Sequence, residues 1–85
     1  MIVTPKSETI TLTGTLDTVS NASHVLLTNQ TASAVIVTLY TEANTAAVKG
    51  SLPVAAGASQ ILFKAPFDSI NVSANIYATA VTARY

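Results

Sequence analysis

The stretch that decides the fold is a run with apolar side chains on both of its faces, Ala34-Val35-Ile36-Val37-Thr38-Leu39-Tyr40-Thr41. β-Branched and aromatic residues favour the pleated surface of a sheet, so this run predicts a β-strand over 34–41. Antiparallel strands with one face in water normally alternate apolar and polar residues more strictly. The strand therefore lies either in the middle of a sandwich, with another layer over its back, or with its back against another subunit.

Alternation with period two continues on both sides of this run and predicts further half-buried strands. These strands are expected over residues 9–14, 23–28, 60–64, 69–73 and 77–85. The residues expected to face the core are Ile10 with Leu12, Val25 with Leu27, and Ile61 with Phe63.

Polar and turn-forming residues indicate how these strands connect. The short polar segment 29–33 predicts a β-hairpin between the strands on either side of it. Residues 46–49 fit a short edge strand, whose edge Lys49 would blunt, and the alanine-rich segment 44–48 fits instead a single helical turn. A loop is expected over 53–59, centred on Gly57.

Together these patterns predict an all-β fold, a small antiparallel β-sandwich or barrel of six to seven short strands. The 85 residues allow a single domain over 1–85, in which residues 1–6 can form an N-terminal arm. A domain of this size usually gains stability from disulfides, metals or partner subunits. Because the sequence has no Cys and His24 is its only histidine, partner subunits remain as the expected stabiliser.

Charge is scarce and balanced. Charged residues make up 9% of the sequence and its formal net charge is zero, whereas globular domains average about 25%. Proteins that are soluble as free monomers usually keep a net charge, so much of this surface is expected to be covered by neighbours. The few scattered basic residues cannot form the positively charged surface that binding to the phosphates of nucleic acid requires. No signal peptide and no apolar run of the ~18 residues that span a bilayer are seen, so no membrane partner is expected.

No group of residues predicts catalysis. His24 lies within a predicted strand and has no nucleophile motif beside it. Acid–base chemistry needs two carboxylates in one cleft, and Glu8, Asp17, Glu42 and Asp68 are dispersed over turns and strand ends. We therefore expect no enzymatic activity, no catalytic residues, no cofactor and no metal site.

An interface is the kind of functional site that the sequence does favour. The candidates are apolar residues on the second face of strand 34–41, one on strand 60–64, and aromatics in a loop and at the C-terminus. They are Val35, Val37, Leu39, Leu62, Phe67 and Tyr85. Phe67, between a proline and an aspartate, is the best candidate for an exposed anchor, because buried centres of interfaces favour aromatic side chains.

The pattern Val25-Leu26-Leu27-Thr28-Asn29, a polar turn and then Ala34-Val35-Ile36-Val37 resembles the opening hairpin of small β-sandwich proteins encoded among tailed-phage virion genes. The segment Leu52-Pro53-Val54-Ala55-Ala56-Gly57-Ala58-Ser59 and the ending Ile76-Tyr77-Ala78-Thr79-Ala80-Val81 are similar to their downstream loop and final strand pair. The resemblance covers residues 22–85 and transfers no site residues.

This resemblance implies a structural protein of the bacteriophage virion, such as a capsid decoration or cement protein or a neck or tail adaptor. Its partners would be copies of itself and other virion proteins, such as the major capsid protein. It would be made in the host cytoplasm and reside on the capsid or on the neck or tail surface.

Two other functions stay open at this point. One is a receptor- or carbohydrate-binding module of a tail fibre or adhesin, which exposed aromatics around a concave surface would favour. The other is a pilus-like filament subunit joined by strand exchange, for which residues 1–6 are the candidate donor.

Overall fold

The computed structural model describes residues 2–41 and 47–84, with side chains described over 3–41 and 47–82. Within these ranges every regular element is a β-strand, which confirms the all-β prediction. The strands are β1 (Ile2–Pro5), β2 (Ile10–Leu12), β3 (His24–Thr28), β4 (Val35–Tyr40), β5 (Val48–Val54), β6 (Ser59–Phe63), β7 (Ser69–Val72) and β8 (Ile76–Arg84). A helix able to cross a membrane is not found in the described residues.

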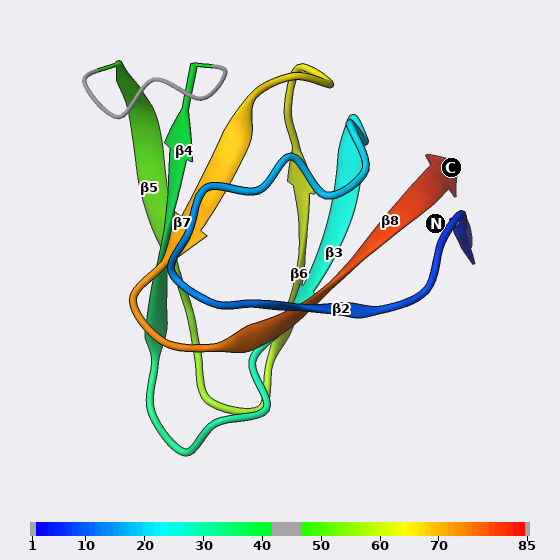
Figure 1. Ribbon diagram of the computed structural model, residues 1–85. Coiled ribbons are helices and arrows are strands. Elements are labelled where there is room, and N and C mark those ends of the chain that lie inside the picture. The colour runs from blue at the N-terminus through cyan, green and yellow to red at the C-terminus, as the bar shows by residue number, and fades with distance from the viewer. Residues whose placement is uncertain (1, 42–46, 85) are drawn as a thin grey trace.

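Two antiparallel sheets make up the sandwich. The larger sheet has the order β1-β8-β3-β6, with β2 also paired to β8, and the smaller has the order β5-β4-β7. Figure 1 shows the smaller sheet on one side, β6, β3 and β8 on the other, and β2 crossing in front. Of the residues 1–6 expected as an arm, Ile2–Pro5 form β1, which pairs with the end of β8.

The core lies between the two sheets and is built from alternate residues of most strands. Val25 and Leu27 are fully buried, and Leu12 is 1% exposed, so the core residues expected on β2 and β3 are confirmed. Val35 and Val37 on β4 are also buried in this core, at 1% and 2% exposed. The prediction that these two valines lie at an interface is therefore wrong, because their face of β4 meets the opposite sheet.

The predicted hairpin is also wrong. Strands β3 and β4 do not pair with each other: β3 pairs with β6 and β8, while β4 pairs with β5 and β7. The chain crosses from one sheet to the other at Asn29, which is fully buried. The Asn29 Nδ2 atom donates to the carbonyls of Ser33 and Val54, both at 2.8 Å, and its Oδ1 accepts from the Thr31 N–H at 2.9 Å.

The backbone of Asn29 joins this crossing to a second one. The Asn29 N–H donates to the Ala58 carbonyl at 2.9 Å, and the Gly57 N–H donates to the Asn29 carbonyl at 2.8 Å. Gly57 has a φ of 74°, a conformation that glycine adopts without steric cost. One buried asparagine therefore holds together both connections at this end of the sandwich.

Strand β6 presents the opposite face from the one expected. Its register pairs Leu62 with the buried Val25, and directly paired residues point to the same side of a sheet. Leu62 accordingly packs against the core, while Phe63 is 55% exposed. The expectation that Ile61 and Phe63 face inward is wrong, because three consecutive apolar residues give no period from which to choose a face.

Candidate interaction surfaces

The first surface is the outer side of the larger sheet, where β6, β3 and β8 lie next to one another. Because Val25 and Leu27 point into the core, the alternate residues of these strands point outward. The register sets them in rows, Ser59–Thr28–Tyr77, Ile61–Leu26–Thr79 and Phe63–His24. With His24 neutral, none of these side chains carries a formal charge, so we name the set the neutral outer face.

Two aromatic side chains mark opposite ends of the neutral outer face. Phe63 is 55% exposed and Tyr77 is 43% exposed, while Leu26 and Ile61 between them are half-buried. Thr79 is buried, because the Thr9 hydroxyl reaches it at 2.7 Å from the segment between β1 and β2. The accessible part of the face therefore lies over β3 and β6 and extends onto β8 only at Tyr77.

His24 takes part in packing on this face. Its ring lies edge-on to Phe63 with the ring centroids 4.5 Å apart, and its Nδ1 atom is 2.9 Å from the Ser23 hydroxyl. Such an aromatic pair contributes about 0.5–1.5 kcal/mol beyond the area that it buries. His24 thus packs against the exposed Phe63 ring on this face.

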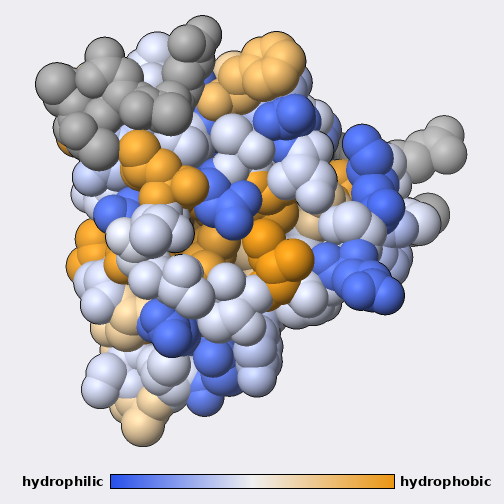
Figure 2. Space-filling view, in the orientation of Figure 1, coloured by the Kyte–Doolittle hydropathy of each residue, from blue (hydrophilic) through white to orange (hydrophobic). Residues whose placement is uncertain are grey.

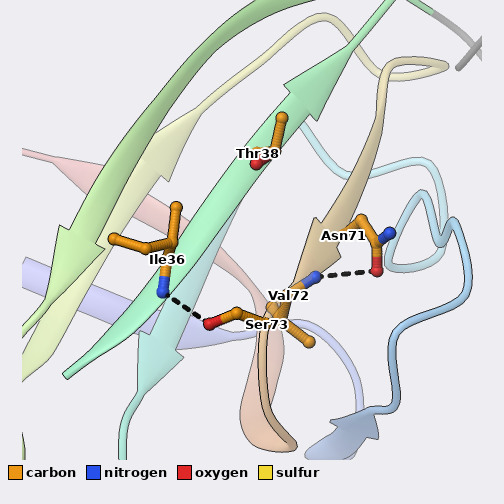
Figure 3. A pocket seen from close by; sticks show the side chains of 5 residues that line it. All are labelled: Ile36, Thr38, Asn71, Val72 and Ser73. Atoms are coloured by element: carbon orange, nitrogen blue, oxygen red, sulfur yellow. Dashed lines mark hydrogen bonds between the residues drawn. The ribbon is translucent and has the colours of Figure 1, made fainter. Parts of the chain in front are cut away.

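A second surface is a pocket of about 170 Å³ on the smaller sheet, over β4 and β7 (Figure 3). It is lined by Ile36, Thr38, Asn71, Val72 and Ser73. The Ser73 hydroxyl accepts from the Ile36 N–H at 3.0 Å, and the Asn71 Oδ1 accepts from the Val72 N–H at 2.8 Å. Two of its polar groups are therefore engaged with the backbone, and its volume is below the ~300 Å³ at which small-molecule pockets begin.

A cluster of charged side chains lies at the end of the sandwich where β6 leads into β7. The carboxylate of Asp68, which is 3% exposed, accepts from Lys49 Nζ at 2.6 Å. Lys64 is 8% exposed, and its Nζ donates to the carbonyls of Ala65 and Pro66 at 3.4 and 2.9 Å. The cluster links β5 to the β6–β7 connection, and its members bond to the protein itself.

Burial lowers the pKa of Lys64 from its ordinary value of 10.5, and the nearby charges of Asp68 and then Asp17 raise it only in part. The unfolded chain therefore binds this proton more tightly than the folded chain does. We expect the free energy of unfolding to increase as the pH rises through the window between the lowered pKa and 10.5. Urea titrations at several alkaline pH values measure this slope, and the same titrations on Lys64→Met should show a smaller one. Equal slopes in both proteins would contradict the linkage to Lys64.

The remaining interface candidates fall at different places. Leu39 and Leu62 are partly buried and pack against the core, whereas Phe67 is 65% exposed. The loop that carries Phe67 forms one end of the molecule in Figure 1, and Figure 2 shows a hydrophobic group projecting there. Tyr85 lies outside the described residues. The structure thus places Phe67 at an exposed position and does not bring it together with Val35 and Val37.

The residues of the neutral outer face were not among the predicted interface residues, because Ile61 and Phe63 were expected to face the core. The signal of this face in the sequence is the set of consecutive apolar residues Val25-Leu26-Leu27 and Ile61-Leu62-Phe63. Successive side chains of a strand point to opposite faces, so a run of three apolar residues places at least one apolar side chain on the outer face. Among the described residues no group of three His, Asp or Glu lies close enough to hold a metal ion.

Comparisons with known proteins give no relative. No protein-family model, no curated protein and no solved structure matches this chain.

Proposed function

We propose that this protein is a structural subunit of a tailed-phage virion, a decoration or cement protein that stabilises the shell through protein–protein contacts. The observation that carries the proposal is the neutral outer face, a sheet surface with exposed aromatic side chains and no formal charge. The kind of assembly is suggested by the resemblance of residues 22–85 to small virion β-sandwich proteins.

The energetics of such a face favour association. Complete burial of a fully exposed Phe side chain contributes about 1.5–3 kcal/mol, and Phe63, which is 55% exposed, would contribute about half of that. The cores of interfaces are depleted in charged residues because desolvated charges are costly. A ligand that binds only the assembled shell stabilises it by mass action. Many copies, each bound through a modest neutral surface, would therefore add stability to a particle.

The binding-module alternative is not favoured by a specific observation. Carbohydrate recognition would call for exposed aromatics around a concave surface, and the described pocket over β4 and β7 has no aromatic residue in its lining. Phe63 and Tyr77 lie on the other sheet.

The proposal is tested by placing one charge in the centre of each outer face. Leu26 and Thr38 are both half-buried and outward-pointing on a central strand, Leu26 in the larger sheet and Thr38 in the smaller. We expect Leu26→Glu to lower the number of copies per purified particle at least tenfold, which corresponds to about 1.4 kcal/mol. Thr38→Glu should leave the copy number unchanged. Quantitative mass spectrometry of gradient-purified particles gives both numbers, and far-UV circular dichroism checks that both variants fold.

Two results bear on this proposal: the first would contradict the function, and the second would contradict the choice of contact surface. One is absence of the unaltered chain from the purified particles. The other is an equal copy number for Leu26→Glu and the unaltered chain, which would show that the neutral outer face does not make the contact.

A further inference from the structure

The two sheets have four edges, and exposed edge strands invite pairing with other chains unless something blunts them. β5, at one edge of the smaller sheet, contains Lys49 and Pro53 and has a register shift opposite Leu39 and Tyr40. A lysine, a proline and a bulge are three of the devices by which proteins protect edges. This edge is therefore protected.

β7, at the other edge of the smaller sheet, is covered in a different way. The N–H and carbonyl of Ile70 bond to the carbonyl and N–H of Asp17, at 2.9 and 3.1 Å. The next outward N–H along the strand, that of Val72, donates to the Asn71 side chain at 2.8 Å. On the larger sheet, the edge beyond β8 is formed by β1 and β2, which are only four and three residues long.

The fourth edge, that of β6, has none of these devices. Its sequence Ser59-Gln60-Ile61-Leu62-Phe63 contains no charge, no proline and no glycine. The register with β3 runs without a shift over the whole strand. In Figure 1 β6 is the end strand of the larger sheet, beyond β3.

The flanking hydrogen bonds show which groups of β6 point away from β3. The Lys64 N–H donates to the Ser23 carbonyl, and the Ala58 carbonyl accepts from Asn29. Backbone groups alternate in direction along a strand, so the even-numbered residues bond to β3. The N–H and carbonyl groups of Ser59, Ile61 and Phe63 therefore point to the free edge, where no described residue of the chain pairs with them.

We propose that the β6 edge is an interface in which β6 pairs antiparallel with β6 of a second copy, about a two-fold axis at Ile61. In this register Ile61 lies opposite itself, and Ser59 lies opposite Phe63 of the second copy. All outward N–H and carbonyl groups of both strands are then paired at once, because the three outward residues are symmetric about Ile61. The inference rests on the proposed function in that it names how copies of a virion subunit contact each other.

A second copy fits this edge because the edge is neutral and symmetric. A two-fold axis brings identical residues together, so a charged strand would meet its own like charge. β6 carries no charge, and the adjacent Lys64 turns its Nζ back to the carbonyls of Ala65 and Pro66. The pairing also makes the neutral outer faces of the two copies continuous across the axis, with Phe63 diagonal to Ile61 of the second copy.

A disulfide across the axis is the direct test. The chain has no Cys, so Ile61→Cys introduces a single thiol at a surface position. Opposed residues in a hydrogen-bonded antiparallel pair have Cα atoms about 5.5 Å apart, which is within the range that a disulfide spans. Under mild oxidation we expect Ile61→Cys to give mostly covalent dimer, and Ser51→Cys on the protected β5 edge to stay mostly monomeric. A monomeric Ile61→Cys, or equal dimer from both variants, would overturn the proposed pairing.

Two solution measurements on the chain without cysteine complete the test. We expect a dimer in sedimentation equilibrium, and at least a tenfold weaker association for Ile61→Lys than for Ser51→Lys. Hydrogen exchange of the Ile61 and Phe63 N–H groups should slow as protein concentration rises. A monomer at all concentrations, or exchange that does not depend on concentration, would refute the pairing.

The failure of this inference can be told apart from the failure of the proposed function. A chain that is present in particles at high copy number, but does not pair through β6, rejects the pairing and leaves the virion role standing. A chain that pairs through β6, but is absent from particles, rejects the virion role and leaves the pairing standing.

Discussion

Replacement of Asn29 by Asp is expected to lower the free energy of unfolding by about 3–5 kcal/mol. The Asn29 Nδ2 atom donates to two backbone carbonyls, those of Ser33 and Val54, in a fully buried site. A carboxylate there would lose both donors and place its negative charge against both carbonyl oxygens. A domain of this length has a free energy of unfolding of roughly 5–10 kcal/mol, so this substitution would remove a large part of it.

Urea denaturation at neutral pH, followed by circular dichroism, measures this effect. Asn75→Asp makes the same chemical change at an exposed position and is expected to alter stability by less than about 0.5 kcal/mol. Similar losses in both variants would show that the buried hydrogen bonds of Asn29 do not hold the two connections together.

Replacement of Asp68 by Asn is the second change with a large expected effect, about 2–4 kcal/mol of lost stability. The Asp68 carboxylate is 3% exposed, bonds Lys49 at 2.6 Å, and its charge favours the protonated form of Lys64. Without that charge, the buried Lys64 ammonium loses its main electrostatic compensation. The folded state is then destabilised because the buried positive charge remains.

Lys49→Met is the matched control, because it breaks the same ion pair from the other side. The Lys49 side chain is 44% exposed, so its charge is largely solvated, and we expect a loss of about 1 kcal/mol or less. Thermal and urea unfolding of the two variants give the comparison. A loss for Lys49→Met that matches or exceeds that for Asp68→Asn would mean that compensation of Lys64 is not what Asp68 provides.

The strands and their approximate limits followed from local sequence. Alternation over 9–14, 23–28 and 69–73 predicted β2, β3 and β7, since the side-chain period of a strand is a property of neighbouring residues. The residues expected in the core from β2 and β3 were confirmed for the same reason. Pro53 was a misleading signal: a loop was expected there, yet β5 continues to Val54, because an edge strand tolerates a proline.

Strand pairing did not follow from local sequence. The polar segment 29–33 was interpreted as a hairpin turn, because its composition is that of a turn. What makes it a crossing between sheets is the bond from Asn29 to Val54, a residue 25 positions later in the chain. A contact with a residue so far away in the sequence cannot be predicted from the composition of the segment itself.

The run 34–41 shows most clearly which features local sequence predicts and which depend on strand pairing. Its apolar residues by themselves indicated a strand with apolar side chains on both faces. Only the tertiary structure decided that Val35 and Val37 fill the core and leave Ile36 outside, 44% exposed. Likewise, three apolar residues in a row on β6 determined a strand, and pairing of Leu62 with Val25 decided which of them faces outward. The physical reason is that alternation is set by the backbone of one strand, whereas the choice of face and edge depends on which distant strand lies beside it.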